Sequence, residues 1–145
     1  YKELTTKYKA SGDFAMAYVI AHEVGHHVQN ELGILGKYHR MQQGLSEKER
    51  NAISVRIELQ ADYLAGVWAR SIQDRNLLDI GDIEEAMNAA HAVGDDTLQE
   101  QAYGYSVPDS FTHGTSEQRM RWFKRGYQYG DLQHGDTFSL SDSEL

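Results

Sequence analysis

Two histidines and a glutamate have the residue types and the spacing of a catalytic metal site. The segment reads His22-Glu23-Val24-Gly25-His26. Within a helix, the four-residue spacing places both imidazoles on one face. One zinc ion can then bind His22 and His26, while Glu23 lies beside the metal and can take a proton from a water molecule. The pattern therefore predicts two zinc ligands and a general base. The alternative is a helix with two packed core histidines.

A catalytic zinc site usually has three protein ligands and leaves the fourth position to water, so a third ligand must come from elsewhere. Glu58 and Asp62 lie four residues apart, in a segment that is otherwise apolar enough to be buried. Buried like charges repel unless a cation lies beside them. We therefore expect zinc at Glu58, and the N–H of a zinc-bound imidazole at Asp62. The alternative places Glu58 on a solvated face, paired with Arg56 or Arg70.

His113 is a further candidate for a catalytic role. It lies in a predicted loop just ahead of a helix. A histidine at the mouth of a site can donate a hydrogen bond to the oxyanion of a tetrahedral intermediate, whereas the alternative is an ordinary loop histidine. Asp95 and Asp96 are explained as helix caps, and one of them is a candidate to orient His113. We expect His27 to pack or to support the site, because it points about 100° away from His26.

Helices must position these side chains, since most segments carry a 3.6-residue apolar period and there is no internal repeat. The chain is therefore predicted to be mainly α, with a helix from near Asp13 to near Gly33 as the active-site helix. It should pack on a second long helix. The remaining predicted helices span 46 to about 70, about 83–93, 98–103 and 115 to just before 130.

Local sequence signals set the ends and the buried faces of these helices. Ser46 with Glu49, and Thr115 with Gln118, have the spacing of capping boxes. We expect residues from Asp131 onward to be loosely ordered at their end. An apolar stripe predicts the face of the second helix that packs on the first, and another predicts the core face of the last helix. These stripes are Ile53, Ile57, Ala61, Leu64 and Trp68, and then Met120, Phe123 and Tyr127.

Composition excludes several classes of protein. The chain has 145 residues, which fits a single domain over 1–145. It has 22 acidic against 14 basic residues, a net charge of -8, so nucleic acid is not an expected partner. It has no cysteine, so any metal must be held by histidine and carboxylate. No apolar run approaches the roughly 20 residues that span a bilayer, so we expect this chain not to cross a membrane.

Together these segments resemble the bacterial putative neutral zinc metallopeptidase family, within the broader gluzincin class that includes thermolysin. The resemblance covers most of the chain, and its signature is HExxH followed downstream by ExxAD. It implies a zincin-like core with His22, His26 and Glu58 as zinc ligands, Glu23 as the catalytic base and Asp62 behind the ligands. It also implies that His113 steadies the tetrahedral intermediate. The matching segments are Gly12-Asp13-Phe14, 22–29, 58–62, 65–68, 94–96, 113–119 and Trp122-Phe123.

The chain departs from the family pattern at its start. Family members usually have an upstream membrane anchor and strands before the active-site helix, whereas this chain starts about a dozen residues before Asp13. We therefore expect the upstream sheet to be absent or truncated. The chain alone leaves the cellular compartment open. The resemblance suggests that the full-length protein is a bacterial, membrane-anchored protein.

The sequence thus predicts a zinc-dependent peptidase, most simply an endopeptidase, that acts on a peptide or protein substrate. Two alternatives stay open. In the first, the protein is a non-catalytic binding module whose zinc is structural, which requires a site closed by four protein ligands. In the second, the protein hydrolyses a non-peptide amide with the same residues.

Overall fold

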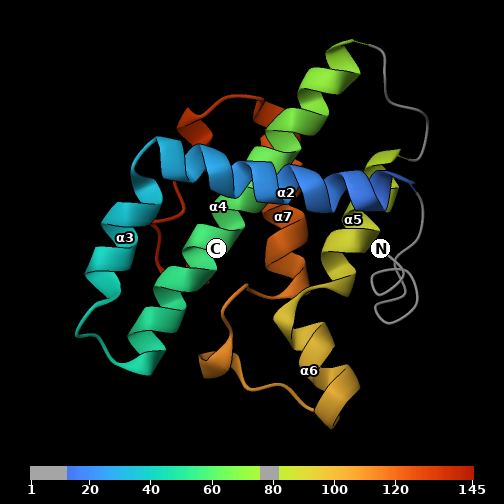
Figure 1. Cartoon of the computed structure of the whole chain (residues 1–145). Helices are drawn as coiled ribbons and strands as arrows, with labels where there is room; N and C mark the ends of the chain where they lie inside the picture. Colours follow the sequence, from blue (N-terminus) through green and yellow to red (C-terminus); the bar gives the residue numbers. More distant parts are fainter. Residues whose placement is uncertain (1–12, 76–81) are drawn as a thin grey trace.

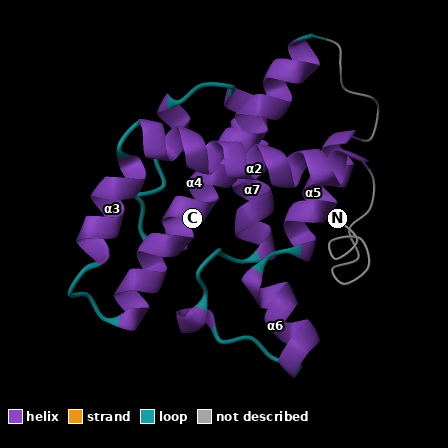
Figure 2. Ribbon diagram, viewed as in Figure 1, coloured by secondary structure: helices purple, strands orange, loops and turns teal. Residues whose placement is uncertain are grey.

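The computed structural model describes residues 13–75 and 82–145. Every regular element in these residues is a helix, which confirms the mainly α class (Figures 1 and 2). Any truncation of an upstream sheet lies before Asp13, outside the described residues. The helices are α2 (Asp13–Glu31), α3 (Ile34–Gln42), α4 (Glu47–Asp74), α5 (Asp82–Ala92), α6 (Asp95–Tyr103) and α7 (Ser116–Tyr129). Short 3-10 turns are η1 (Pro108–Ser110), η2 (Gln133–Gly135) and η3 (Asp142–Glu144).

Helix α4 is the centre of the fold, with α2 crossing it on one side and α7 packed along another (Figure 1). Glycines permit these close approaches. A Cβ atom on Gly25 of α2 would lie 2.9 Å from the carbonyl oxygen of Ala61. A Cβ atom on Gly126 of α7 would lie 1.9 Å from the carbonyl oxygen of Tyr63. Side chains at these glycines would therefore push α2 and α7 away from α4.

The core between α2, α4, α5 and α7 is built mainly from small residues around two aromatic rings. Tyr18 and Phe123 are 1% exposed and meet edge to face, with ring centroids 5.6 Å apart. Small side chains let the helix axes approach closely, so backbone and Cβ atoms provide much of the contact. The buried alanines are Ala21, Ala65, Ala69, Ala86, Ala89, Ala90 and Ala92.

The predicted apolar stripe of α4 describes only part of its buried surface. Ile57 and Ala61 are buried, whereas the other three stripe residues are half-buried. Leu59 and Tyr63 are also fully buried, because α4 is covered by α7 as well as by α2. In α7, Phe123 is buried, and Met120 and Tyr127 are partly buried against the core, as predicted.

The predicted helix boundaries are close to those observed, but α3 was not predicted. Helix α2 ends at Glu31, and Gly33 has φ of 78°, which fits the predicted stop. A new helix begins at once, at Ile34. None of its residues is buried, and it is held by a ring stack between Tyr38 and Phe138 and by hydrogen bonds from Gln42 to α4. A short polar helix of this kind carries a weak sequence signal.

The capping predictions had mixed outcomes. Thr115 and Gln118 form the complete box at the start of α7. Ser46 caps α4 by accepting the Glu49 N–H at 3.2 Å, but its hydroxyl donates to the Glu49 carboxylate, so the reciprocal half of that box is absent. The expectation that Asp95 caps a helix was wrong, because α6 begins at Asp95 itself and its N-cap is Gly94. Asp95 and its neighbour bind another segment instead.

The residues after Asp131 lie against the helices, contrary to the looseness that we expected of them. Thr137 is fully buried, and its hydroxyl donates to the carbonyl oxygen of Arg56. The Arg56 guanidinium in turn donates to the carbonyl oxygen of Leu140 at 3.0 Å. The Trp122 indole N–H donates to the carbonyl oxygen of Leu145, which is 2% exposed. These contacts anchor the segment to α4 and α7.

None of the helices in residues 13–75 and 82–145 has both the length and the apolar character needed to span a bilayer.

Candidate metal centre

The two HExxH histidines and Glu58 converge on a single point between α2 and α4. The Nε2 atom of His22 lies 2.8 Å from Oε2 of Glu58, and the Nε2 atom of His26 lies 3.0 Å from the same oxygen. One ligand atom from each of the three residues lies within 4.8 Å of the other two. Two imidazole nitrogens and a carboxylate are a donor set that suits zinc. The residues present therefore fit the metal that the sequence predicts.

Gly25 makes this convergence possible. It lies within the HExxH segment, on the face of α2 that contacts α4, and it is buried. Its hydrogen faces the Ala61 backbone, so the axes of α2 and α4 come close enough for one carboxylate to reach both imidazoles. The rings themselves meet nearly perpendicular, at 88°. The residue between the histidines is thus part of the geometry of the site.

The shifted pKa values of His22 and Glu58 show that the Glu58 carboxylate is negatively charged and is paired with positive charge. Burial favours neutral His22, but the Asp62 carboxylate and the hydrogen bonds to Asp62 and Glu58 outweigh it and raise the pKa of His22 to about 9. Burial likewise opposes the charged form of Glu58, yet hydrogen bonds from both imidazoles hold its pKa well below the usual value. In the metal-free protein, positive charge therefore faces Glu58. Metal binding requires the Nε2 protons to leave, so it is coupled to proton release.

Asp62 holds His22 from behind. It is fully buried, and one of its oxygens, Oδ1, lies 2.8 Å from Nδ1 of His22 and accepts the Tyr18 hydroxyl at 2.6 Å. The other oxygen accepts Nε of Arg119 at 2.8 Å. Burial would raise the pKa of Asp62, but the charges of Arg119 and His22 lower it to about 2. The carboxylate therefore stays ionised and can keep the Nδ1 proton of His22 in place.

Arg119 and Tyr18 were missed as supporting residues by the sequence reasoning. Arg119 belongs to α7 and is only 5% exposed, with Nη1 donating to the carbonyl oxygen of Val93. In the sequence it looks like one of several basic residues on a surface helix. The signal that could have revealed Arg119 was the predicted burial of Asp62. His22 lies between the Asp62 and Glu58 carboxylates, so Asp62 needs a further positive charge beside it.

Glu58 does not make the solvated ion pair that was the alternative. Arg56 instead donates to the carbonyl oxygens of Ala52 and Leu140 and pairs with Asp142 at 2.7 Å. Arg70 bonds to carbonyl oxygens of α7 and lies 3.4 Å from Asp74.

The proposed base Glu23 is exposed on α2, between the two histidines in sequence. Its exposure leaves the carboxylate accessible to water, as a general base requires. His27 is also exposed. It lies 3.8 Å from Glu31 on the surface of α2, so the expectation that it packs or supports the site was wrong. His27 follows His26 directly, so it points to a different side of α2, which faces solvent and not the core.

His113 lies in the loop before α7, outside the group formed by His22, His26 and Glu58. Its side chain is 48% exposed. Nδ1 of His113 lies 2.9 Å from the Thr112 hydroxyl and 3.4 Å from Oδ1 of Asp95. The His113 side chain therefore contacts its own loop and Asp95 of α6.

Asp95 is the residue that fixes this loop. Its Oδ2 atom accepts the backbone N–H groups of Thr112, His113 and Gly114 at 2.9, 2.6 and 3.1 Å. Burial would raise the pKa of Asp95, but the hydrogen bonds from His113 and its neighbour lower it. Asp96 accepts the N–H of Ser116 at 2.7 Å. Of the two aspartates, Asp95 is therefore the one placed to orient His113.

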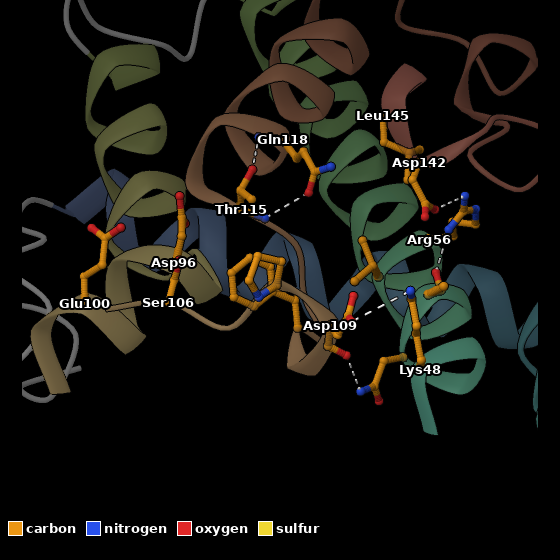
Figure 3. Close-up of a pocket in the computed structure, with 15 residues that line it drawn as sticks. Lys48, Arg56, Asp96, Glu100, Ser106, Asp109, Thr115, Gln118, Asp142 and Leu145 are labelled. Atoms are coloured by element: carbon orange, nitrogen blue, oxygen red, sulfur yellow. Dashed lines mark hydrogen bonds and ion pairs between the residues drawn. The ribbon is translucent and has the colours of Figure 1, made fainter. Parts of the chain in front are cut away.

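A cavity of about 400 Å³ lies on another side of α4, between its N-terminal half, α6 and the C-terminal segment (Figure 3). Its walls include two ion pairs, Lys48 with Asp109 and Arg56 with Asp142. The three candidate metal ligands do not line it. The candidate metal site is therefore recognised from the convergence of His22, His26 and Glu58, and it is separate from this cavity.

Comparison with known proteins places the geometry in context. The model of the family described as "Putative neutral zinc metallopeptidase" matches residues 1–138. "Uncharacterized protein YpfJ" of Escherichia coli (strain K12) is 57% identical over 141 residues, which are 97% of the chain and 49% of that protein. "Uncharacterized protein Rv2575" of Mycobacterium tuberculosis (strain H37Rv) is 44% identical over 153 residues, covering 98% and 50% respectively. No solved structure matches the chain. The chain spans about half the length of these relatives.

Proposed function

Since the chain belongs to the putative neutral zinc metallopeptidase family, we propose that it is a zinc-dependent peptidase that cleaves internal bonds of a peptide or protein substrate. The observation that carries the proposal is the convergence of both HExxH imidazoles on one oxygen of Glu58, at 2.8 and 3.0 Å. We further propose that α2 packed on α4 is the centre of a zincin-like catalytic core. The closeness of the two helices at Gly25 supports this.

His22, His26 and Glu58 would hold the metal in this mechanism. Bound zinc supplies a Lewis acid and makes an associated water more acidic. Glu23 takes the proton of the attacking water and passes it to the leaving amine nitrogen, so no covalent intermediate with the protein is needed. Its exposed position on α2 supports that exchange with solvent.

Two further groups complete the proposed site. His113 donates a hydrogen bond to the oxyanion of the tetrahedral intermediate, and the hold of Asp95 on its backbone keeps it in place. Asp62, neutralised by Arg119, keeps the His22 ring oriented with Nε2 toward Glu58. The proposed site therefore combines residues of α2, α4, α6 and α7 with the loop before α7.

The number of ligands favours a catalytic site over a structural one. A structural zinc site is closed by four protein ligands, whereas a catalytic site has three and keeps one position open. In the described part of the chain, the candidate group contains three residues. Hydrolysis of a non-peptide amide would use the same three ligands, so the substrate assay must distinguish it from peptide hydrolysis.

Glu23→Gln tests the proposal. The amide keeps the shape of the side chain but cannot accept the proton, so this variant should bind zinc as the wild type does and lose hydrolysis of an unstructured protein such as casein. Glu31→Gln is the matched control, because Glu31 is exposed on the same helix. Full activity of Glu23→Gln at equal zinc content would show that Glu23 is not the base. A zinc-loaded wild type that cleaves simple amides but no peptide would favour the non-peptide alternative.

A further inference from the structure

The two candidate histidine ligands are supported by different chemical groups. Nδ1 of His22 faces the Asp62 carboxylate, whereas Nδ1 of His26 lies 2.8 Å from the amide oxygen of Gln29. Gln29 lies one helical turn after His26, is 0% exposed and has no role in the proposed mechanism. Packing alone would be satisfied by an apolar side chain at this position, so the buried polar amide of Gln29 beside His26 calls for another explanation.

The orientation of the Gln29 amide is fixed by its other two contacts. Its nitrogen donates to the carbonyl oxygen of Ile57 at 2.9 Å and to the side-chain oxygen of Gln60 at 2.8 Å. An amide nitrogen has two N–H groups, and both are used. The reversed amide would place its oxygen against two other oxygens, and its two N–H groups would lose both of these acceptors. The oxygen of Gln29 must therefore face His26.

Gln60 is oriented by the same logic. Its side-chain oxygen accepts from Gln29, and its nitrogen donates to the carbonyl oxygen of Gly135 at 3.0 Å. Gly135 is buried in η2, where a Cβ atom would lie 2.6 Å from the Tyr63 ring, so its position is tightly determined. Hydrogen bonds thus run in one direction from His26 through two amides to the segment after α7.

We infer that Gln29 is a positioning residue for His26, and that Gln60 and the Gly135 carbonyl hold Gln29 in the required orientation. An oxygen can only accept, so Nδ1 of His26 must donate its hydrogen to Gln29. Nδ1 is thereby excluded as the ligand atom, and Nε2, which faces Glu58, is the nitrogen that binds the metal. The inference rests on the proposed zinc site and adds to it a residue, and a tail contact, that the HExxH spacing does not indicate.

The segment after α7 is linked to the candidate metal site through the hydrogen bond from Gln60 to the Gly135 carbonyl. The residues at 133–135 form η2, outside the two helices that carry the candidate ligands, and the Gly135 carbonyl ends the chain of hydrogen bonds that reaches His26. Loss of the link at Gln60 should therefore disturb the metal site from a distance, although less than loss of Gln29 itself.

The test compares zinc affinity in three variants, measured by competition with a chelator. Gln29→Met has nearly the same volume but replaces the amide oxygen by a thioether, which is only a weak acceptor, so it should weaken zinc binding by about 10- to 100-fold, as changes behind a metal ligand do. Gln60→Met leaves Gln29 beside His26 and should cause a smaller but measurable loss. Gln101→Met, at an exposed position of α6, is the matched control and should bind zinc as the wild type does.

A second measurement separates positioning from general stability. In the zinc-loaded wild type with ¹⁵N-labelled histidine, nuclear magnetic resonance should show His26 with a hydrogen on Nδ1 and the metal on Nε2. In Gln29→Met, that hydrogen should exchange faster with water, while the corresponding hydrogen of His22 stays protected by Asp62. A purely structural role for Gln29 would not single out His26.

The outcomes are distinct from those of the peptidase proposal. A wild type that binds no zinc contradicts the proposed function. A wild type that binds zinc, with Gln29→Met equal to Gln101→Met in affinity or with His26 bound through Nδ1, overturns the inference alone. If Gln29→Met does not fold, Gln60→Met decides: an affinity equal to that of Gln101→Met overturns the inference, and a loss supports it.

Discussion

Asp62→Asn tests the buried ion pair that lies behind the candidate metal ligands. Asp62 accepts the Tyr18 hydroxyl at 2.6 Å and two nitrogens of Arg119 at 2.8 and 3.2 Å. An asparagine has a single acceptor oxygen, and its NH₂ group must face at least one of these donors. Arg119, only 5% exposed, would then keep its charge inside the protein without its direct ion-pair partner.

The size of the effect follows from this geometry. Removing one partner of a buried pair costs about 3–5 kcal/mol. Nη1 of Arg119 keeps its bond to the carbonyl oxygen of Val93, so part of the guanidinium stays satisfied. We therefore expect a loss in the free energy of unfolding near the lower end, about 3 kcal/mol. This is a large share of the roughly 5–15 kcal/mol that a domain has in total.

Urea unfolding of the zinc-free protein in a chelator measures this loss apart from any change in metal affinity. Asp142→Asn is the matched control, because the Asp142 side chain is 83% exposed in its pair with Arg56 and its loss should cost no more than about 1 kcal/mol. In combination with Arg119→Met, the Asp62→Asn variant should be less destabilised than the sum of the two single changes. Equal losses for Asp62→Asn and Asp142→Asn, or strict additivity in the double variant, would show that Asp62 and Arg119 do not stabilise each other as a buried ion pair.

Three further predictions concern the helices, the charges and the loop. His22 has a folded-state pKa of about 9, above its unfolded value because Asp62 and Glu58 outweigh burial. Zinc-free protein should therefore keep this stabilisation below about pH 6.5 and lose it as the pH rises through about 9; a thermal-unfolding midpoint that does not fall over this range would contradict it. Gly25→Ala, whose Cβ would lie 2.9 Å from a backbone oxygen of α4, should cost about 1–3 kcal/mol in urea unfolding and weaken zinc binding in chelator competition. Gly36→Ala, which meets only the end of the Arg40 side chain, should have little effect, and equal behaviour of the two would count against the close approach. Asp95→Ala should lower kcat by up to about 100-fold at unchanged zinc affinity, because it frees the loop that holds His113. An unchanged kcat in steady-state kinetics would show that Asp95 does not position His113 for catalysis.

The sequence was sufficient for the elements that carry strong local signals. The capping box at Thr115, the stop at Gly33 and the long period of α4 predicted the main helices to within a few residues, because each signal is set by neighbours in the chain. The i, i+4 spacings in α2 and α4 also placed the candidate ligands His22, His26 and Glu58 on the faces where the two helices meet. Only one additional assumption, that the two helices pack together, was needed to assemble the candidate site.

The supporting contacts could not be predicted in the same way, because they join residues far apart in sequence. Asp95 looked like a cap, yet it binds backbone groups 17 to 19 positions later. Arg119 looked like a surface base, yet it neutralises a buried aspartate 57 positions earlier. Gln29 had no apparent role until the backbone of Ile57 and the amide of Gln60 were placed around it. Propensity and spacing carry no information on such pairs.

The position of zinc in a crystal, determined from anomalous diffraction at the zinc edge, would show directly whether His22, His26 and Glu58 bind the metal. We predict one strong peak between α2 and α4, about 2.0–2.2 Å from Nε2 of His22, Nε2 of His26 and a carboxylate oxygen of Glu58, with no fourth protein ligand. A peak at another place in the molecule, or a fourth protein side chain closing the site, would contradict it.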